Sequence, residues 1–310
     1  NIDSEDYGTC TVAACGFAGY MFDVPLTSED IAADGKVAYT INLEGTKGGH
    51  SGVDIEKNRA NSIKAVDYCM AWAKYLGMDV QIASFTGGTG MTAIPALANA
   101  TIVFSAEFEE QFKAEMDRNI ALFAQQFDLT EAGYTFNYEK VDVPASVLTA
   151  ECSATVIDLI AALEDGVNTI SQRYKGITET SFNLGTVEFA AGMESSTVMA
   201  AMRCSSRWPV MLANMQMVAI GNAFGIPATT WGTFDPDAIS VGWEEKETDV
   251  IAKMYKTAFD AYTGDDCVIT AVHGGLECAD FASWSDTLEV ISVGPTVENP
   301  HSVSEFVEID

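Results

Sequence analysis

The sequence contains few basic residues. Lysine and arginine together number 16, against 45 aspartates and glutamates, so the formal net charge is −29 over 310 residues. A surface of that sign repels phosphate groups, which argues against sequence-independent binding to nucleic acid or to anionic lipid. The charge itself identifies no partner. A solvated acidic surface that keeps the protein soluble, or that suits a salty habitat, is sufficient to explain it.

Long apolar runs are also missing. No stretch reaches the roughly 20 consecutive apolar residues that a membrane-spanning helix requires, although 48% of the residues are hydrophobic. The first six residues, Asn1 to Asp6, are acidic and precede no apolar segment, so they do not resemble a secretory signal. We expect a cytoplasmic globular protein that is large enough for two packed units.

The cysteines do not indicate a disulfide framework. There are seven, an odd number, and they stand in apolar neighbourhoods such as Tyr68-Cys69-Met70. Reduced and buried thiols in a cytosolic protein explain this pattern better. Cys10 and Cys15 lack a second nearby pair of Cys or His, so they do not predict a structural zinc site.

Apolar periodicity predicts strands and helices in alternation. Residues 37–43 alternate apolar and polar side chains with a period of two, as a half-buried strand does. Further strands are expected over 100–104, 182–189, 196–203, 268–272 and 288–293. Helices are expected after a cap at Ser51 or Asp54, and over 108–127, 155–170, 209–224 and 248–262. This order predicts a layered α/β architecture.

Only three histidines occur, and each stands in a Gly-rich or turn-like setting, where function and structure explain it equally well. His50 lies within Gly48-Gly49-His50-Ser51-Gly52, where the backbone can approach a ligand closely. Asp3 and His301, at opposite ends of the chain, carry side chains suited to zinc. Two ligands do not hold a catalytic zinc, which usually takes three protein groups. These residues alone therefore make only a weak case for a metal site.

A stronger signal comes from five segments taken together. They are NIDSEDYG (1–8), KGGHSGVDI (47–55), TETSFNLG (178–185), HGGLEC (273–278) and the segment 294–302, which begins GPTV and ends PHS. In order and spacing they resemble the aminoacyl-histidine dipeptidases (peptidase D), a family of cytosolic di-zinc peptidases related to carnosinases. None of the five segments is specific alone, but together they span the whole chain.

The resemblance implies a fold and an activity. The α/β fold would be a partial zinc-peptidase catalytic domain (α/β/α) interrupted by an α+β lid. Residues 1–22 and 241–310 would be pieces of the catalytic domain and residues 23–240 the lid, through which relatives often form homodimers. The implied activity is zinc-dependent hydrolysis of Xaa-His and other unblocked dipeptides. The complete active site would hold two zinc ions, with manganese or cobalt as alternatives.

The resemblance also implies roles for single residues near the substrate. His50 matches a histidine that steadies the oxyanion of the tetrahedral intermediate. Arg203 matches an arginine whose planar fork grips the substrate carboxylate. Asn183 and His273 would lie near the substrate, although hydrogen bonding within turns explains these two equally well.

The metal site is matched only in part. Asp3 and His301 match zinc ligands of the family, although Val303 and Ser304 replace the Pro-Asp that usually follows the histidine. The family's His-x-Asp motif, its bridging Asp and its Glu-Glu pair, which supplies the general base, are expected upstream of Asp3. We therefore expect this chain alone to be inactive, with the upstream segment present as another chain, removed by cleavage, or outside this sequence.

Two rival interpretations remain open. The first is a non-catalytic structural or binding remnant of the same fold, with its metal site lost. The second is an aminoacylase or carboxypeptidase of the same superfamily, acting on N-acyl amino acids. The HGGLEC segment favours the dipeptidase over the second rival.

Overall fold

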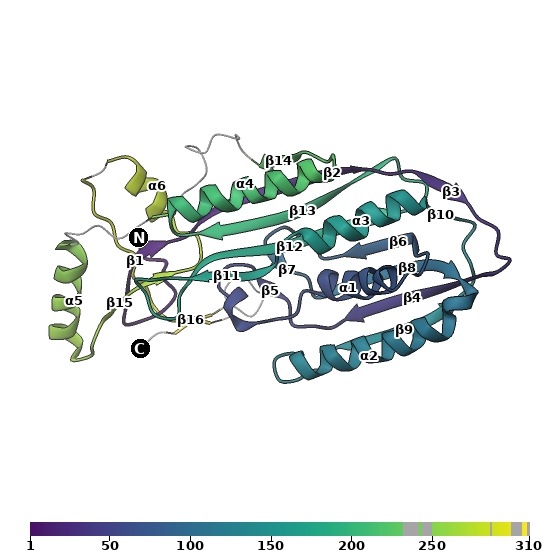
Figure 1. Cartoon of the computed structure of the whole chain (residues 1–310). Coiled ribbons are helices and arrows are strands. Elements are labelled where there is room, and N and C mark those ends of the chain that lie inside the picture. Colours follow the sequence, from purple (N-terminus) through teal and green to yellow (C-terminus); the bar gives the residue numbers. More distant parts are fainter. Residues whose placement is uncertain (232–241, 244–249, 286, 299–305, 309–310) are drawn as a thin grey trace.

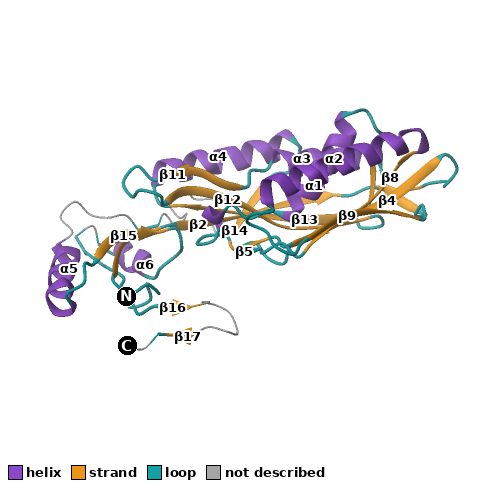
Figure 2. Cartoon of the chain, turned by 90° about the horizontal axis from the view of Figure 1, so that it is seen from below, coloured by secondary structure: helices purple, strands orange, loops and turns teal. Residues whose placement is uncertain are grey.

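The computed structural model describes residues 1–231, 242–243, 250–285, 287–298 and 306–308. Most of these residues form one large sheet with four helices on one of its faces, and the remainder form a smaller unit at one end (Figures 1 and 2). The amino terminus lies at the smaller unit (Figure 1). None of the helices in the described ranges is long and apolar enough to cross a membrane.

The large sheet has nine strands in the order β14-β2-β13-β12-β6-β8-β4-β9, with β11 beside β12. Their bounds are β2 (Gly16–Pro25), β4 (Lys36–Glu44), β6 (Gln81–Gly87), β8 (Leu97–Ser105), β9 (Thr135–Val141), β11 (Gly166–Ile170), β12 (Thr178–Ala190), β13 (Ser195–Cys204) and β14 (Ala228–Trp231). All pairings are antiparallel. Strand β12 joins the two halves of the sheet, because its first half pairs with β11 and β13 and its end pairs with β6.

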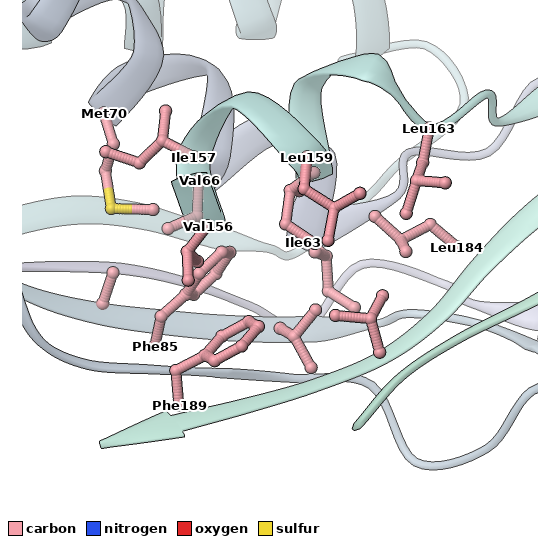
Figure 3. Packing of buried hydrophobic residues seen from close by; sticks show 14 of the residues in the cluster. Ile63, Val66, Met70, Phe85, Val156, Ile157, Leu159, Leu163, Leu184 and Phe189 are labelled. Carbon is pink, nitrogen blue, oxygen red and sulfur yellow. The ribbon is translucent and has the colours of Figure 1, made fainter. Parts of the chain in front are cut away.

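Four helices cover one face of this sheet: α1 (Ser62–Tyr75), α2 (Glu109–Phe127), α3 (Ala150–Ala162) and α4 (Arg207–Ala223) (Figure 2). In α1, Ile63, Val66 and Met70 are three or four positions apart, so they point to the same side of the helix. They are fully buried against the sheet, where Phe85 and Phe189 meet them (Figure 3). Burial of one such side chain stabilises the fold by about 1.5–3 kcal/mol.

The smaller unit is built on a parallel pair, β1 (Thr9–Ala14) and β15 (Val268–Val272), with α5 (Val250–Thr263) and α6 (Cys278–Ser283) beside it. Its own small core contains Cys10, Val12, Ala252 and Cys267. Only Cys15 separates β1 from β2, so the chain passes directly from this unit into the large sheet. Three short pairs complete the strands: β3 (Ser28–Asp30) with β10 (Ser146–Leu148), β5 (Gly49–His50) with β7 (Ala93–Ile94), and β16 (Val297–Glu298) with β17 (Phe306–Val307).

Much of the sequence prediction is confirmed. The fold is mixed α/β, all seven cysteines are buried and free, and the expected strands over 37–43, 100–104, 182–189 and 196–203 lie within β4, β8, β12 and β13. The helices expected over 108–127 and 209–224 correspond to α2 and α4. The 248–262 helix corresponds to α5, although its first two expected residues lie outside the described ranges.

Two predicted helices were placed wrongly. The helix expected over 155–170 ends at Ala162, because the chain turns at Gly166 with a φ of +88° and continues as strand β11. The helix expected after Ser51 or Asp54 begins later. A short 3₁₀ helix, Ile55–Lys57, stops at Asn58 in the left-handed region, and the side chain of Asn61 then caps α1 by accepting from two backbone N–H groups.

The strand expected over 288–293 is also wrong. In the structure this segment makes only a single antiparallel bridge, between Thr11 and Ser292. Its side chains are mostly apolar, as in a short buried strand, but it forms no longer ladder with any neighbour in the part of the chain that the structure describes.

Candidate functional site

The polar residues of interest lie on the face of the large sheet that the helices do not cover. Successive side chains of a strand point to opposite faces. Phe182 and Met202 belong to the core beneath the helices, so their neighbours Ser181, Asn183 and Arg203 face the other way. The register sets Ser181 opposite Arg203. This part of the sheet is therefore polar on one face and apolar on the other.

Arg203 is held at the end of β13, and its side chain is buried. Its guanidinium lies over the ring of Phe17, 5.3 Å from the centroid, because Phe17 is its cross-strand partner on β2. Its Nη2 is 3.1 Å from Nε2 of His50, and its Nε lies 3.5 Å from Oγ of Ser51. Removing a guanidinium from water is costly unless an anion or several acceptors meet it, so this group is suited to bind an anion.

His50 comes from the short strand β5, which pairs with β7. The backbone N–H groups of Gly52 and Val53 approach its Nδ1 at 3.3 and 3.4 Å, while Arg203 approaches its Nε2. A neutral imidazole has one acceptor nitrogen. Whichever tautomer is present, one ring N–H therefore faces another donor. An anion placed between His50 and Arg203 would accept from both.

The His50 loop is fixed by Asp54. Its Oδ2 accepts from the backbone N–H of His50 at 2.8 Å, and its Oδ1 binds Lys57 at 2.8 Å and Arg59 at 2.9 Å. Burial would raise the pKa of Asp54, but the hydrogen bonds from Lys57 and His50 and the charge of Arg59 outweigh it and hold the pKa below its usual value. Asp54 is therefore ionised near neutral pH and anchors the loop.

Glycine is required at position 49. The residue has a φ of +127°, and a Cβ there would lie 1.9 Å from Nη1 of Arg59 and 2.5 Å from Oδ2 of Asp54. The chain can thus pass directly over the Asp54–Arg59 ion pair only because no side chain is present. This is the physical reason for the Gly48-Gly49 pair before the histidine.

His273 joins the smaller unit to the large sheet. It directly follows β15, it is buried, and its Nε2 is 2.7 Å from Oγ of Ser181 on β12. Burial lowers the pKa of His273 to about 4, with further lowering from the charges of Arg203 and His50. His273 is therefore neutral at pH 7. A Cβ on Gly52 would lie 2.6 Å from the His273 carbonyl oxygen and 3.0 Å from Cε1 of His50, which places the two histidines on either side of Gly52.

Asn183 holds the segment that pairs with His50. Its Nδ2 donates to the carbonyl oxygens of Met91 and Ala93, each at 2.9 Å, and Ala93 is the strand partner of His50. Its buried Oδ1 has no hydrogen-bond partner within the described ranges. Asn183 is thus bound to the segment that carries β7, and one acceptor remains available.

The two expected metal ligands are not brought together by anything that the structure describes. Asp3 is exposed, and its backbone N–H donates to Oδ1 of Asn1 at 2.7 Å. His301 lies outside the described residues. Among the described residues, no three His, Cys, Asp or Glu side chains gather as a metal site. They therefore do not by themselves form the site of a catalytic zinc, which takes three or more protein ligands.

Sequence reasoning missed Ser181, Ser51, Cys15 and Phe17 as part of this region. Cys15 lies beside Arg203, and burial raises its pKa to about 11 although the charge of Arg203 acts in the opposite direction. It therefore remains a neutral thiol. Ser181 belongs to a polar run on a strand that is buried on both faces. The run of polar residues within this strand was the feature of the sequence that could have indicated a functional role for Ser181.

No protein-family model matches the chain. The chain is 26% identical over 312 aligned residues to a cytosol non-specific dipeptidase of Escherichia coli (strain K12), covering 100% of this chain and 62% of that protein. It is similar in structure to an aminoacylhistidine dipeptidase from Vibrio alginolyticus, with a TM-score of 0.86 and 25% identity over 99% of this chain and 61% of that one. In sequence and fold, the chain is peptidase D-like. This peptidase D-like chain spans about three fifths of the length of both relatives.

Proposed function

We propose that this chain provides the substrate-gripping part of a dipeptidase that hydrolyses Xaa-His and other unblocked dipeptides. The two relatives are named as dipeptidases, which supports a hydrolase acting on peptides. The complete activity would need segments beyond this chain, because the chain corresponds to about three fifths of each relative. The cytosolic relative supports a cytoplasmic location.

The contact between His50 and Arg203 carries the proposal. In the tautomer that accepts at Nδ1, Nε2 of His50 carries an N–H and lies 3.1 Å from Nη2 of Arg203, so both side chains would present donors to the same small space. A dipeptide supplies two suitable oxygen groups, its terminal carboxylate and the oxyanion that develops on the scissile carbonyl. Arg203 would hold the carboxylate by a charge-assisted pair of hydrogen bonds. His50 would donate to the oxyanion, where a preorganised donor acts mainly on the transition state.

Asn183 and His273 take supporting roles in this proposal. The two bonds from Asn183 to the β7 segment hold the strand that pairs with His50, and its remaining acceptor would face the substrate. His273, neutral and bound to Ser181, would form the wall at one end of the dipeptide. The smaller unit would thus contribute directly to the substrate site.

The metal site would be shared with residues outside this chain. Asp3 and His301 would be two of the ligands, and the remaining ligands and the general base would come from an upstream segment. Zinc, two ions in the complete site and replaceable by manganese or cobalt, would lower the pKa of its bound water and polarise the scissile carbonyl. Residues 1–22 and 241–310 would then be catalytic-domain pieces, and residues 23–240 the lid, through which two copies would associate.

The proposal is tested by adding the upstream segment. The 310-residue chain alone should bind zinc weakly and should not hydrolyse a Xaa-His dipeptide such as Gly-His. Supplying the upstream segment, in the same chain or as a second one, should restore both properties, and His301→Ala should remove both again. Hydrolysis of Gly-His by the pure chain would show that the base lies within it. A reconstituted protein with full zinc occupancy and no activity would favour a structural role.

A further inference from the structure

A second site lies on the other side of the large sheet. A cavity of about 780 Å³ opens among the helices, bounded by α1 from Asn61 to Cys69, by α2 from Asn119 to Phe127, and by β11. Its lining includes neither His50 nor Arg203. Sites that enclose small molecules usually measure about 300–1,000 Å³, so the size suits a small organic ligand.

The walls of the cavity are largely apolar and aromatic. Phe123, Phe127 and Phe136 line it. Tyr68 and Val167 also belong to its lining, and both are exposed although they are large and apolar. An apolar ligand body would cover these exposed side chains, and the removal of their apolar surface from water would favour binding.

At one end of the cavity stands an acceptor without a donor. Asn119, on α2, is 4% exposed, and its Oδ1 has no hydrogen-bond partner in the part of the chain that the structure describes. Its amide group is hydrogen-bonded to the thiol of Cys69 on α1. A buried acceptor left unpaired is unfavourable, so this end of the cavity is suited to a ligand O–H or N–H group.

At the other end stands a carboxyl group without a counter-ion. Asp165 lines the cavity, and its Oδ1 accepts from Nδ2 of Asn61 at 2.7 Å and from the backbone N–H of Leu184 at 2.9 Å. Burial raises the pKa of Asp165, and the hydrogen bonds and Lys64 offset this only in part. No ion pair among the described residues includes Asp165 or Glu56, the second carboxylate of the lining.

The two cations of the lining already have partners. Arg59 is paired with Asp54 at 2.9 Å. Nζ of Lys64 donates to the carbonyl oxygens of Ile160, Ala161 and Leu163 at the end of α3, at 2.7, 3.2 and 2.7 Å, which accounts for its three N–H groups. The charge available to a ligand in this cavity is therefore negative.

The distance between the two ends sets the length of the ligand. Asn61 contacts Asp165 and Cys69 contacts Asn119, and both belong to the same face of α1, eight positions apart. A helix rises 1.5 Å per residue, so the two ends are separated by roughly 12 Å. A ligand that reaches both must carry a donor at each end of an apolar body.

We propose that this cavity binds an organic amine with an aromatic body and a distal hydroxyl or N–H group. The ammonium group would lie at Asp165, the ring among the phenylalanines, and the distal donor at Asn119. This site is independent of the dipeptidase proposal, because it uses no residue of the His50–Arg203 region.

The test is calorimetric titration of the full chain with tyramine, compared with 2-phenylethylamine and 3-(4-hydroxyphenyl)propionate. Tyramine should bind at least tenfold more tightly than the carboxylate and several-fold more tightly than the amine without a hydroxyl. Asp165→Asn should weaken tyramine at least tenfold, and Asn119→Leu should remove its advantage over 2-phenylethylamine. Equal binding of all three compounds, or no binding of tyramine, would overturn the proposal.

A substitution at an exposed residue of the lining blocks the cavity without removing a buried side chain, so it separates a loss of binding from a loss of folding. Val167→Trp adds bulk at an exposed position of the lining and should abolish binding. Leu129→Trp adds the same bulk at a fully exposed position outside the lining and should leave the affinity unchanged. Tyramine affinity that survives Val167→Trp would place any binding outside this cavity.

Discussion

The imidazole of His50 and the guanidinium of Arg203 lie 3.1 Å apart, although 153 positions separate the two residues in the chain. His50 comes from the short strand β5, which pairs with β7 outside the large sheet, and Arg203 comes from β13 within it. Arg203 can donate to Nε2 only when this nitrogen carries no proton, and Nδ1–H then faces the backbone N–H groups of Gly52 and Val53. An acceptor bound beside the imidazole would remove this mismatch.

In the complete enzyme that we propose, the two side chains should affect different kinetic constants. Arg203→Lys should raise KM by roughly ten- to a hundredfold, because a hydrogen-bonded contact to a charged group contributes about 1.5–3 kcal/mol. His50→Ala should lower kcat by on the order of a hundredfold or more, the loss seen when one oxyanion donor is removed. Arg118→Lys, at an exposed ion pair with Glu115, is the control and should change neither constant. Identical effects of the first two substitutions would contradict the assigned roles.

Gly49→Ala should disrupt the His50 loop. The new Cβ would meet Arg59 and Asp54 at a φ of +127°, so we expect a loss of more than about 2 kcal/mol in the free energy of unfolding. Gly77→Ala is the matched control, because Gly77 also has a positive φ of +89° but nothing lies within 4 Å of its Cβ position. That variant should lose only about 1 kcal/mol. Chemical denaturation measures both, and equal losses would show that backbone strain alone decides the effect.

His273 should make the protein less stable in mild acid. The imidazole takes up a proton at pH 6.5 in the unfolded chain and at about 4 in the folded protein. Between these values the unfolded state binds more protons, so the free energy of unfolding decreases as the pH falls from 6.5 to 4. The full effect is about 3 kcal/mol, at 1.36 kcal/mol per pH unit. Urea unfolding of the protein and of His273→Gln across this range should show a shallower pH slope in the variant, and equal slopes would refute the prediction.

The core beneath the helices should be sensitive to truncation. Phe189 is fully buried between β12 and the helix layer, so Phe189→Ala should reduce the free energy of unfolding by about 3–5 kcal/mol. Leu97→Ala removes an exposed side chain from β8 and should change it by less than about 0.5 kcal/mol. Thermal or urea unfolding distinguishes the two. A small loss at Phe189 would indicate that the cavity collapses.

Local pattern located most of the strands. Residues 182–189 lie within β12, although this strand is buried on both faces and so shows little alternation. The end of α3 was missed because Leu163, Glu164 and Asp165 are compatible with a helix, and the left-handed turn at Gly166 decides otherwise. Residues 288–293 show that an apolar run does not ensure a partner strand.

The site residues were identified through the resemblance to a family of peptidases. The contacts between them could not be predicted in this way. Nothing local to His273 indicates that Ser181 will meet it, since the contact crosses 92 positions and joins the smaller unit to the large sheet. The support that Asn183 gives to the β7 segment is equally remote in sequence. Such pairings follow from sheet order, which a single sequence specifies only weakly.

Cys15 is the only residue between β1 of the smaller unit and β2 of the large sheet, so a change of backbone angle there would turn β2 relative to the smaller unit. Ala14 is tied to Trp243 by a pair of backbone hydrogen bonds of 2.9 Å each, while β2 begins one residue after Cys15 and extends for ten residues. A strand of that length reaches about 33 Å at 3.3 Å per residue. A bend of roughly 10° at Cys15 would carry the far end of β2 through about 6 Å, whereas His50, Arg203 and Ser181 lie near the Ser181–His273 contact between the two units and would move much less.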